Sequence, residues 1–210
     1  MTQDVEGRGL SRHAGLKHLE RLVMLSDGVF AIAITLSALE IRPEPGEGVS
    51  LWQAWGPPLL IYFLSFFLIG LVWLVHRRIV SYLHDIDAIS TIINMVLLSL
   101  VALVPVVVRF ALTHPTREGA FLVYALAFAV LYAVMALLWG YTAFLARLAP
   151  DVSRAVASEL LCKLCFAVAV FAAVAMYQLG LMVAAVICVL VALPLRWMAW
   201  RQGQRAATAS

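Results

Sequence analysis

A carboxylate inside an apolar segment is the feature of this sequence that could do chemistry. Asp27 follows Ser26 within residues 21–41, where most other side chains are aliphatic or small. If Asp27 only capped a helix, about 14 residues would follow before Arg42, fewer than the roughly 20 that cross a bilayer. The helix must therefore start earlier, which places Asp27 a turn or two inside it. An ionisable side chain there could serve transport, or it could pair with a neighbouring helix.

Three polar side chains in the next two apolar segments lie at a depth that suits Asp27. Trp73 and His76 are one turn apart at the end of the second segment, and Asn94 lies within the third. Polar contacts of this kind hold membrane helices together, each contributing about 0.6 to 2 kcal/mol. His76 could instead titrate together with Asp27, or it could simply be interfacial. The residue types leave these alternatives open.

The first segment also carries an aliphatic stripe. At about 100° per residue, Ile32, Leu36 and Leu39 fall within about 60° of the helix circumference, with Thr35 at the edge. Asp27 points about 140° away from Ile32. Such stripes commonly pack against lipid or other helices, so periodicity alone gives this one no function. The direction of Asp27 favours a structural role for its carboxylate.

These residues belong to a chain that is too apolar for a soluble domain. Of its 210 residues, 64% are hydrophobic and 13% are charged, whereas soluble domains are nearer half and a quarter. Six segments are long enough to cross a bilayer: 21–41, 58–76, 88–108, 119–145, 157–177 and 179–198. We therefore expect an all-α integral membrane protein with six transmembrane helices. One membrane domain, 19–198, would lie between polar tails at 1–18 and 199–210.

Prolines and short polar loops set the expected helix ends. Pro57 and Pro58 are assigned to the first turn of the second helix, where a missing N–H is tolerated. Pro105 should kink the third helix. The third break is marked by residues 113–116. The last break is only Tyr177–Gly180, so the final two helices should form an antiparallel hairpin.

The basic residues gather on one side of this arrangement. That side holds twelve: Arg8, Arg12, Lys17, Arg21, Arg77, Arg78, Arg147, Arg154, Lys163, Arg196, Arg201 and Arg205. The opposite side holds three: Arg42, Arg109 and Arg117. Because short loops rich in Lys and Arg stay in the cytoplasm, we expect both termini there. The basic residues are dispersed among apolar spans, so their charge does not indicate a nucleic-acid partner.

Motifs of other functional classes are missing or lack their context. Cys162 and Cys165 have a redox or zinc spacing, but no second ligand pair accompanies them. There is no phosphate loop, HExxH or GxSxG motif. Gly140-Tyr141 lacks the TVGYG context of a potassium filter. We therefore expect no enzyme, no metal site and no cofactor.

The first segment resembles the signature of a known channel family. Arg21-xxx-Leu25-Ser26-Asp27 is similar to the Arg-xxx-Phe-Ser-Asp of the endosomal and lysosomal potassium-channel family and its prokaryotic homologues, with Leu25 in place of Phe. Four further residues sit where the bacterial members place such residues: Trp73, His76, Asn94 and Pro105. The resemblance covers roughly residues 18–198 and is only topological in the last three helices.

This resemblance implies a potassium-permeable, leak-like channel for monovalent cations without a TVGYG filter. Its first helix would line the pore, with a constriction at Ile32, Leu36 and Leu39 and a hydroxyl layer at Thr35. A network of Arg21, Ser26, Asp27, Trp73, His76 and Asn94 would tie helices together. A single six-helix unit implies a homotetramer in a prokaryotic plasma membrane.

The rival interpretation is a secondary transporter or proton-coupled exchanger that uses Asp27 and His76 as titrating groups. The sequence shows no inverted repeat with matching broken helices, which weighs against that class.

Overall fold

The computed structural model describes residues 2–43, 46, 48, 50–113 and 119–207, and throughout these ranges the regular structure is helical. In chain order the elements are α1 (Thr2–Leu36), η1 (Ser37–Glu40), α2 (Leu51–Val80), α3 (Ala88–Thr113), α4 (Ala120–Gly140), η2 (Tyr141–Leu145), α5 (Arg154–Gln178) and α6 (Met182–Ala207). Six helices are long and apolar enough to cross a membrane. The expected all-α class with six spanning helices is confirmed.

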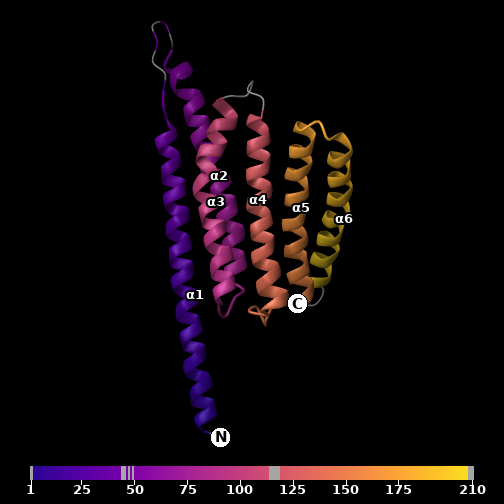
Figure 1. Ribbon diagram of the computed structural model, residues 1–210. Coiled ribbons are helices and arrows are strands. Elements are labelled where there is room, and N and C mark those ends of the chain that lie inside the picture. Colours follow the sequence, from indigo (N-terminus) through magenta and orange to yellow (C-terminus); the bar gives the residue numbers. More distant parts are fainter. Residues whose placement is uncertain (1, 44–45, 47, 49, 114–118, 208–210) are drawn as a thin grey trace.

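The helices stand side by side, with α1 at one edge and the α5–α6 pair at the other (Figure 1). Helix α1 packs on α2 and α3, α3 packs on α4, and α4 packs on α5. Both chain ends lie at the same end of the bundle, and α1 extends beyond the other helices there (Figure 1). This arrangement leaves one whole side of α1 without a partner in the single chain.

Helix α2 begins before the two prolines that were expected to start it. It starts at Leu51, and Pro57 and Pro58 lie inside it. The cause is a capping box at Ser50, whose hydroxyl accepts from the Gln53 N–H at 3.3 Å while the Gln53 side chain accepts from the Ser50 N–H at 3.0 Å. Because this cap satisfies two N–H groups at once, the helix is stable before the prolines are reached.

The turn between the last two helices lies close to its expected position. Helix α5 ends at Gln178, α6 begins at Met182, and Gly180 takes the left-handed φ of 72° that this tight turn requires. The predicted antiparallel hairpin is confirmed. Helix α3 continues through Pro105 to Thr113, and residues 114–116 of the third break lie outside the described residues.

The first and last spanning helices extend into the segments that were expected to be tails. Helix α1 begins at Thr2 and α6 continues to Ala207. The domain limits placed after residues 18 and 198 therefore fall within helices.

One face of α1 is buried against the bundle and fixes how this helix is rotated. The buried side chains recur every three or four residues, as helical packing requires: Leu19, Leu22, Ser26, Phe30 and Ala33 of α1, then Ser37 at the start of η1. They meet the core side chains of α2 and α3, which include Ile69, Val72, Leu97 and Val101. Rotation of α1 is thereby set, and with it the direction of every other side chain on the helix.

Candidate functional site

A buried chain of hydrogen bonds connects α1, α3 and α2. The Ser26 hydroxyl lies 2.8 Å from the Leu22 carbonyl oxygen and donates to it. Asn94 Nδ2 donates to Ser26 Oγ at 3.0 Å, and Asn94 Oδ1 lies 2.8 Å from His76 Nε2. Ser26, His76 and Asn94 are each no more than 1% exposed. Three helices therefore meet at one satisfied polar site inside an apolar bundle.

The order of donors along these hydrogen bonds determines which ring nitrogen of His76 carries a hydrogen. The Ser26 hydroxyl has one hydrogen, and the Leu22 carbonyl accepts it, so Ser26 Oγ must accept from Asn94. The Asn94 amide oxygen then faces His76, so His76 Nε2 carries a hydrogen and donates it. Phe30 of α1 packs beside the imidazole, with ring centroids 5.3 Å apart. This environment holds the ring by both packing and hydrogen bonding.

Asp27 has a partner of its own beside this chain. The Trp73 indole Nε1 donates to Asp27 Oδ1 at 2.8 Å, and Arg77 stacks over the same indole with its guanidinium 5.4 Å from the ring centroid. The carboxylate is exposed in the single chain, unlike Ser26. The structure thus brings five of the six predicted network residues together in two adjacent groups.

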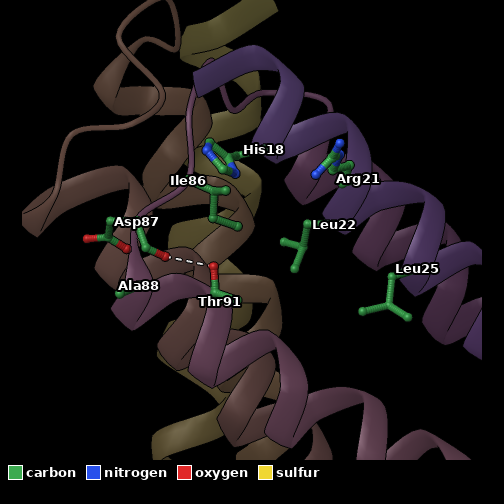
Figure 2. Close-up of a pocket in the computed structure, with 8 residues that line it drawn as sticks. All are labelled: His18, Arg21, Leu22, Leu25, Ile86, Asp87, Ala88 and Thr91. Atoms are coloured by element: carbon green, nitrogen blue, oxygen red, sulfur yellow. Dashed lines mark hydrogen bonds between the residues drawn. The ribbon is translucent and has the colours of Figure 1, made fainter. Parts of the chain in front are cut away.

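Arg21, the sixth predicted network residue, lies apart from them. It is exposed, and within the described part of the chain it makes no hydrogen bond or ion pair. It lines an open pocket of about 420 Å³, together with His18, Leu22, Asp87 and others. Figure 2 shows His18 and Arg21 on the α1 wall of this pocket and Asp87 on the opposite wall.

The aliphatic stripe faces away from the bundle. Ile32, Leu36 and Leu39 are 58%, 43% and 69% exposed. In wheel projection they lie roughly 110° around α1 from the midpoint of the buried Phe30 and Ala33. Beyond Leu36 the helix tightens into the 3₁₀ turn η1, in which residues three apart eclipse. Leu39 is therefore aligned more directly with Leu36 along the helix axis than a continuous α-helix would place it.

Thr35 stands on the same exposed side. Its hydroxyl donates to the Ile32 carbonyl oxygen at 2.9 Å. The single hydroxyl hydrogen is thus used inside the helix, which leaves the oxygen lone pairs directed outward. A hydroxyl in this state can accept hydrogen bonds or contact a cation.

A second polar junction, centred on Asp87, was missed by the sequence analysis. Asp87 Oδ1 accepts from the Ser90 N–H at 2.8 Å, and so it caps α3. Its other oxygen, Oδ2, accepts from the Tyr141 hydroxyl at 2.6 Å. The π-helical turn η2 begins at Tyr141. The signal available in the sequence was Asp-x-x-Ser directly before an apolar run.

This junction predicts acid-sensitive stability. Partial burial alone would raise the pKa of the Asp87 carboxyl, but hydrogen bonds from Ser90 and Tyr141 hold that pKa below its ordinary value of 3.8. The charged form therefore stabilises the fold at neutral pH, and this contribution is lost as pH falls below 3.8 and through the lowered pKa of the folded state. Melting temperatures in detergent, measured from neutral to acid pH, should fall less steeply in Asp87→Asn than in the unsubstituted chain. Equal acid sensitivity of the two proteins would contradict this role.

No group of three or more His, Cys, Asp or Glu side chains among the described residues could hold a metal ion. What the polar groups offer instead is a rigid connection between α1, α2 and α3. The exposed aliphatic face of α1 lies on a different side of the helix from the residues that make this connection.

Comparison with known proteins gives a consistent result. The family described as "Endosomal/lysosomal potassium channel TMEM175" matches residues 21–105. A potassium channel of Streptomyces collinus is 40% identical over 89 residues, which are 40% of this chain and 43% of that protein. A potassium channel of Chamaesiphon minutus is 37% identical over 138 residues, 61% of this chain and 68% of the relative. These relatives are named as channels and not as enzymes.

Longer relatives match over a smaller part of their length. The human endosomal/lysosomal proton channel TMEM175 is 33% identical over 98 residues, which are 41% of this chain and 19% of the human protein. This chain thus spans less than half of the Streptomyces relative and about a fifth of the human protein.

Solved structures share the fold. The crystal structure of the TMEM175 homologue from Chamaesiphon minutus superimposes with a TM-score of 0.61 at 27% identity and covers 85% of this chain and 98% of its own. A bacterial potassium channel, MtTMEM175, superimposes with a TM-score of 0.64 at 16% identity, over 90% of this chain and 93% of its own. Since the Chamaesiphon minutus potassium channel is 37% identical and over two thirds covered, the chain belongs to the TMEM175 family.

Proposed function

We propose that this protein is a potassium-permeable, leak-like cation channel. The observation that carries the proposal is the exposed face of α1. In a chain of this family, Ile32, Leu36 and Leu39 point away from α2 and α3, toward space that the single chain leaves empty. The relatives named as potassium channels give the permeant ion.

The assembly that suits this face is a homotetramer with α1 nearest the axis. Four copies of the stripe would then face one another and form an aliphatic constriction. The buried Ser26, Asn94 and His76 lie on the bundle side of α1, so they would fix the helix without entering the pore. The protein would lie in a prokaryotic plasma membrane, with the side rich in Lys and Arg, and hence both termini, in the cytoplasm.

The constriction can gate by excluding water. A narrow ring of aliphatic side chains dewets, because water gains too little from an apolar wall to fill it. Tilt or rotation of α1 would widen the ring and admit a partly hydrated ion. The outward lone pairs of Thr35 could then replace some of the water lost by potassium, because the hydroxyl hydrogen is already bound to the Ile32 carbonyl.

The test is the flux of potassium and of sodium through purified protein in liposomes. We expect passive flux down either gradient, larger for potassium. The main rival is a proton-coupled exchanger that uses Asp27 and His76. Trp73, which donates to Asp27, lies one turn from His76 on α2. That rival requires flux of one ion strictly coupled to another. No passive flux from vesicles that contain folded oligomer would reject the channel.

Asp27 provides a test of the structural role of the polar groups. Asp27→Ala removes the acceptor for the Trp73 indole N–H, which should lower stability by about 1 kcal/mol. We expect a smaller fraction of assembled oligomer and unchanged ion selectivity in the protein that does assemble. Size-exclusion chromatography and liposome flux measure the two effects separately.

Asp27→Asn is the matched control, since its amide oxygen can still accept from Trp73. It should assemble better than Asp27→Ala. Normal assembly of Asp27→Ala with altered selectivity would instead place Asp27 in the permeation path.

A further inference from the structure

The other edge of the molecule carries a pocket that the channel proposal does not use. It lies between α5 and α6, has a volume of about 660 Å³, and is lined by residues that include Glu159, Lys163, Leu193, Arg196, Trp197 and Trp200. These two helices form the edge of the bundle away from α1 (Figure 1). The pocket lies toward the end of the bundle where the chain termini lie, because its α6 residues belong to the last turns of that helix.

Charge in this pocket is only partly balanced by the protein. Lys163 forms an ion pair with Glu159 one turn away on α5. The Glu159 side chain is only 14% exposed, and Gly203 of α6 lies against it, since a Cβ there would stand 3.3 Å from its carboxylate. Glu159 is therefore held in place and committed to Lys163.

Arg196 is the charge left without an acidic partner. Its guanidinium lies 5.9 Å from the Phe166 ring centroid, and in the part of the chain that the structure describes no carboxylate pairs with it. Glu159, Lys163 and Arg196 together leave the pocket with a formal charge of one positive unit. Arg196 also lies within the apolar span Met182–Gln204. A cation at such a position is stabilised by an anion at the same depth.

The rest of the lining is apolar or aromatic. Leu193 lies one turn deeper in the span than Trp197, and Trp200 lies nearer the end of α6. Both Trp side chains are more than half exposed. Indole rings gather at the depth of lipid headgroups because they are partly polar and partly apolar. The pocket therefore offers a cation beside aromatic and aliphatic surface, at headgroup depth.

We propose that this pocket binds an anionic phospholipid of the leaflet on the basic side of the protein. The phosphate would pair with Arg196, the indoles would contact the glycerol region, and Leu193 would contact the start of an acyl chain. Basic pockets between transmembrane helices recognise anionic headgroups in this way. The apolar share of the lining favours a lipid over free phosphate, which has no part to place against Leu193 and the indoles. This inference stands independently of ion conduction.

Native mass spectrometry of the detergent-purified full-length protein tests the inference, with phosphatidylglycerol and phosphatidylcholine offered as separate probes. We expect phosphatidylglycerol to be retained preferentially. Arg196→Gln should weaken this retention about fivefold, the factor that corresponds to about 1 kcal/mol for one basic side chain near a membrane surface.

Two variants keep the result interpretable. Arg154→Gln removes the same charge from the neighbouring helix α5, but Arg154 is exposed at the start of that helix and does not line the pocket. It should retain the lipid normally. Arg196→Lys keeps the charge and should retain most of the binding, so it serves if the Gln variant does not fold.

Equal retention of the two lipids by the unsubstituted protein would overturn the proposal. So would undiminished retention in Arg196→Gln, or an equal loss in Arg154→Gln. Displacement of the lipid by glycerophosphate or inorganic phosphate at similar concentrations would also overturn it, because the site would then recognise a soluble phosphate.

Discussion

Replacing Ile32 with Asn should increase passive potassium flux through the reconstituted protein by about tenfold, which corresponds to lowering the barrier by about 1.4 kcal/mol. The reason is the exposed position of Ile32 on the free face of α1. Four amides in place of four aliphatic side chains would bind water in the proposed constriction, and a wet constriction no longer excludes ions. Liposome flux at matched protein density measures the effect.

Ile187→Asn is the matched control for this prediction. Ile187 lies on α6 and is 54% exposed, close to the 58% of Ile32. The chemical change is the same, but the side chain lies on a helix at the far edge of the bundle, away from α1 (Figure 1). Its flux should equal that of the unsubstituted protein. If both variants raise flux equally, or neither does, Ile32 does not form the gate.

Most of the fold could be predicted from the sequence because apolar segment length dominates in a membrane. The six spans and the hairpin of the last two helices follow from lengths and from a four-residue break at Tyr177–Gly180. The predicted start of α2 was wrong because the prediction relied on the two prolines and did not consider a helix cap before them. The Ser50–Gln53 capping box sets that end, and its contribution is visible only once its two hydrogen bonds are formed.

Which residues form the candidate site could be predicted from the sequence, but which of them bond to one another could not. Depth along the helices grouped Asp27, Trp73, His76 and Asn94, and the family resemblance added Ser26. Which side chain bonds which depends on how each helix is rotated, and that is set by packing between helices that no single segment reveals. The structure separates Asp27–Trp73 from Ser26–Asn94–His76.

Asp87 and Arg21 show the other limit of the sequence. Asp87 finds Tyr141 across 54 positions of sequence, a partner that only the tertiary arrangement supplies. Arg21 belongs to the family signature, yet in the single chain it lines the pocket opposite Asp87 and stays outside the network. The resemblance located the residue, but not its surroundings.

The second large effect is expected at Asn94, where the buried chain of hydrogen bonds can be cut at its centre. Asn94→Leu has a similar size but cannot accept from His76 Nε2, so a buried N–H loses its partner. This should cost about 1 to 3 kcal/mol. The Ser26 hydroxyl still has the Leu22 carbonyl. Melting temperature and oligomer yield in one detergent measure the loss.

Ser99→Ala on the same helix is the control for Asn94→Leu. The Ser99 hydroxyl is exposed and donates only to the Val96 carbonyl of its own helix. Its removal should change stability by less than about 0.5 kcal/mol. A comparable loss in both variants would mean that α3 is sensitive to any polar deletion, and that Asn94 has no special role.

The decisive comparison adds a second substitution to Asn94→Leu. In His76→Phe/Asn94→Leu both the donor and its acceptor are gone, and the new ring can pack where the imidazole packs beside Phe30. Removing both members of a buried pair costs much less than orphaning one of them. The double variant should therefore be more stable than Asn94→Leu alone, so the effects of the two substitutions are non-additive. The contrary outcome is a double variant whose loss of stability equals the sum of the losses in the two single variants. The two side chains would then contribute through packing alone, and the proposed network would not hold α1 against α2 and α3.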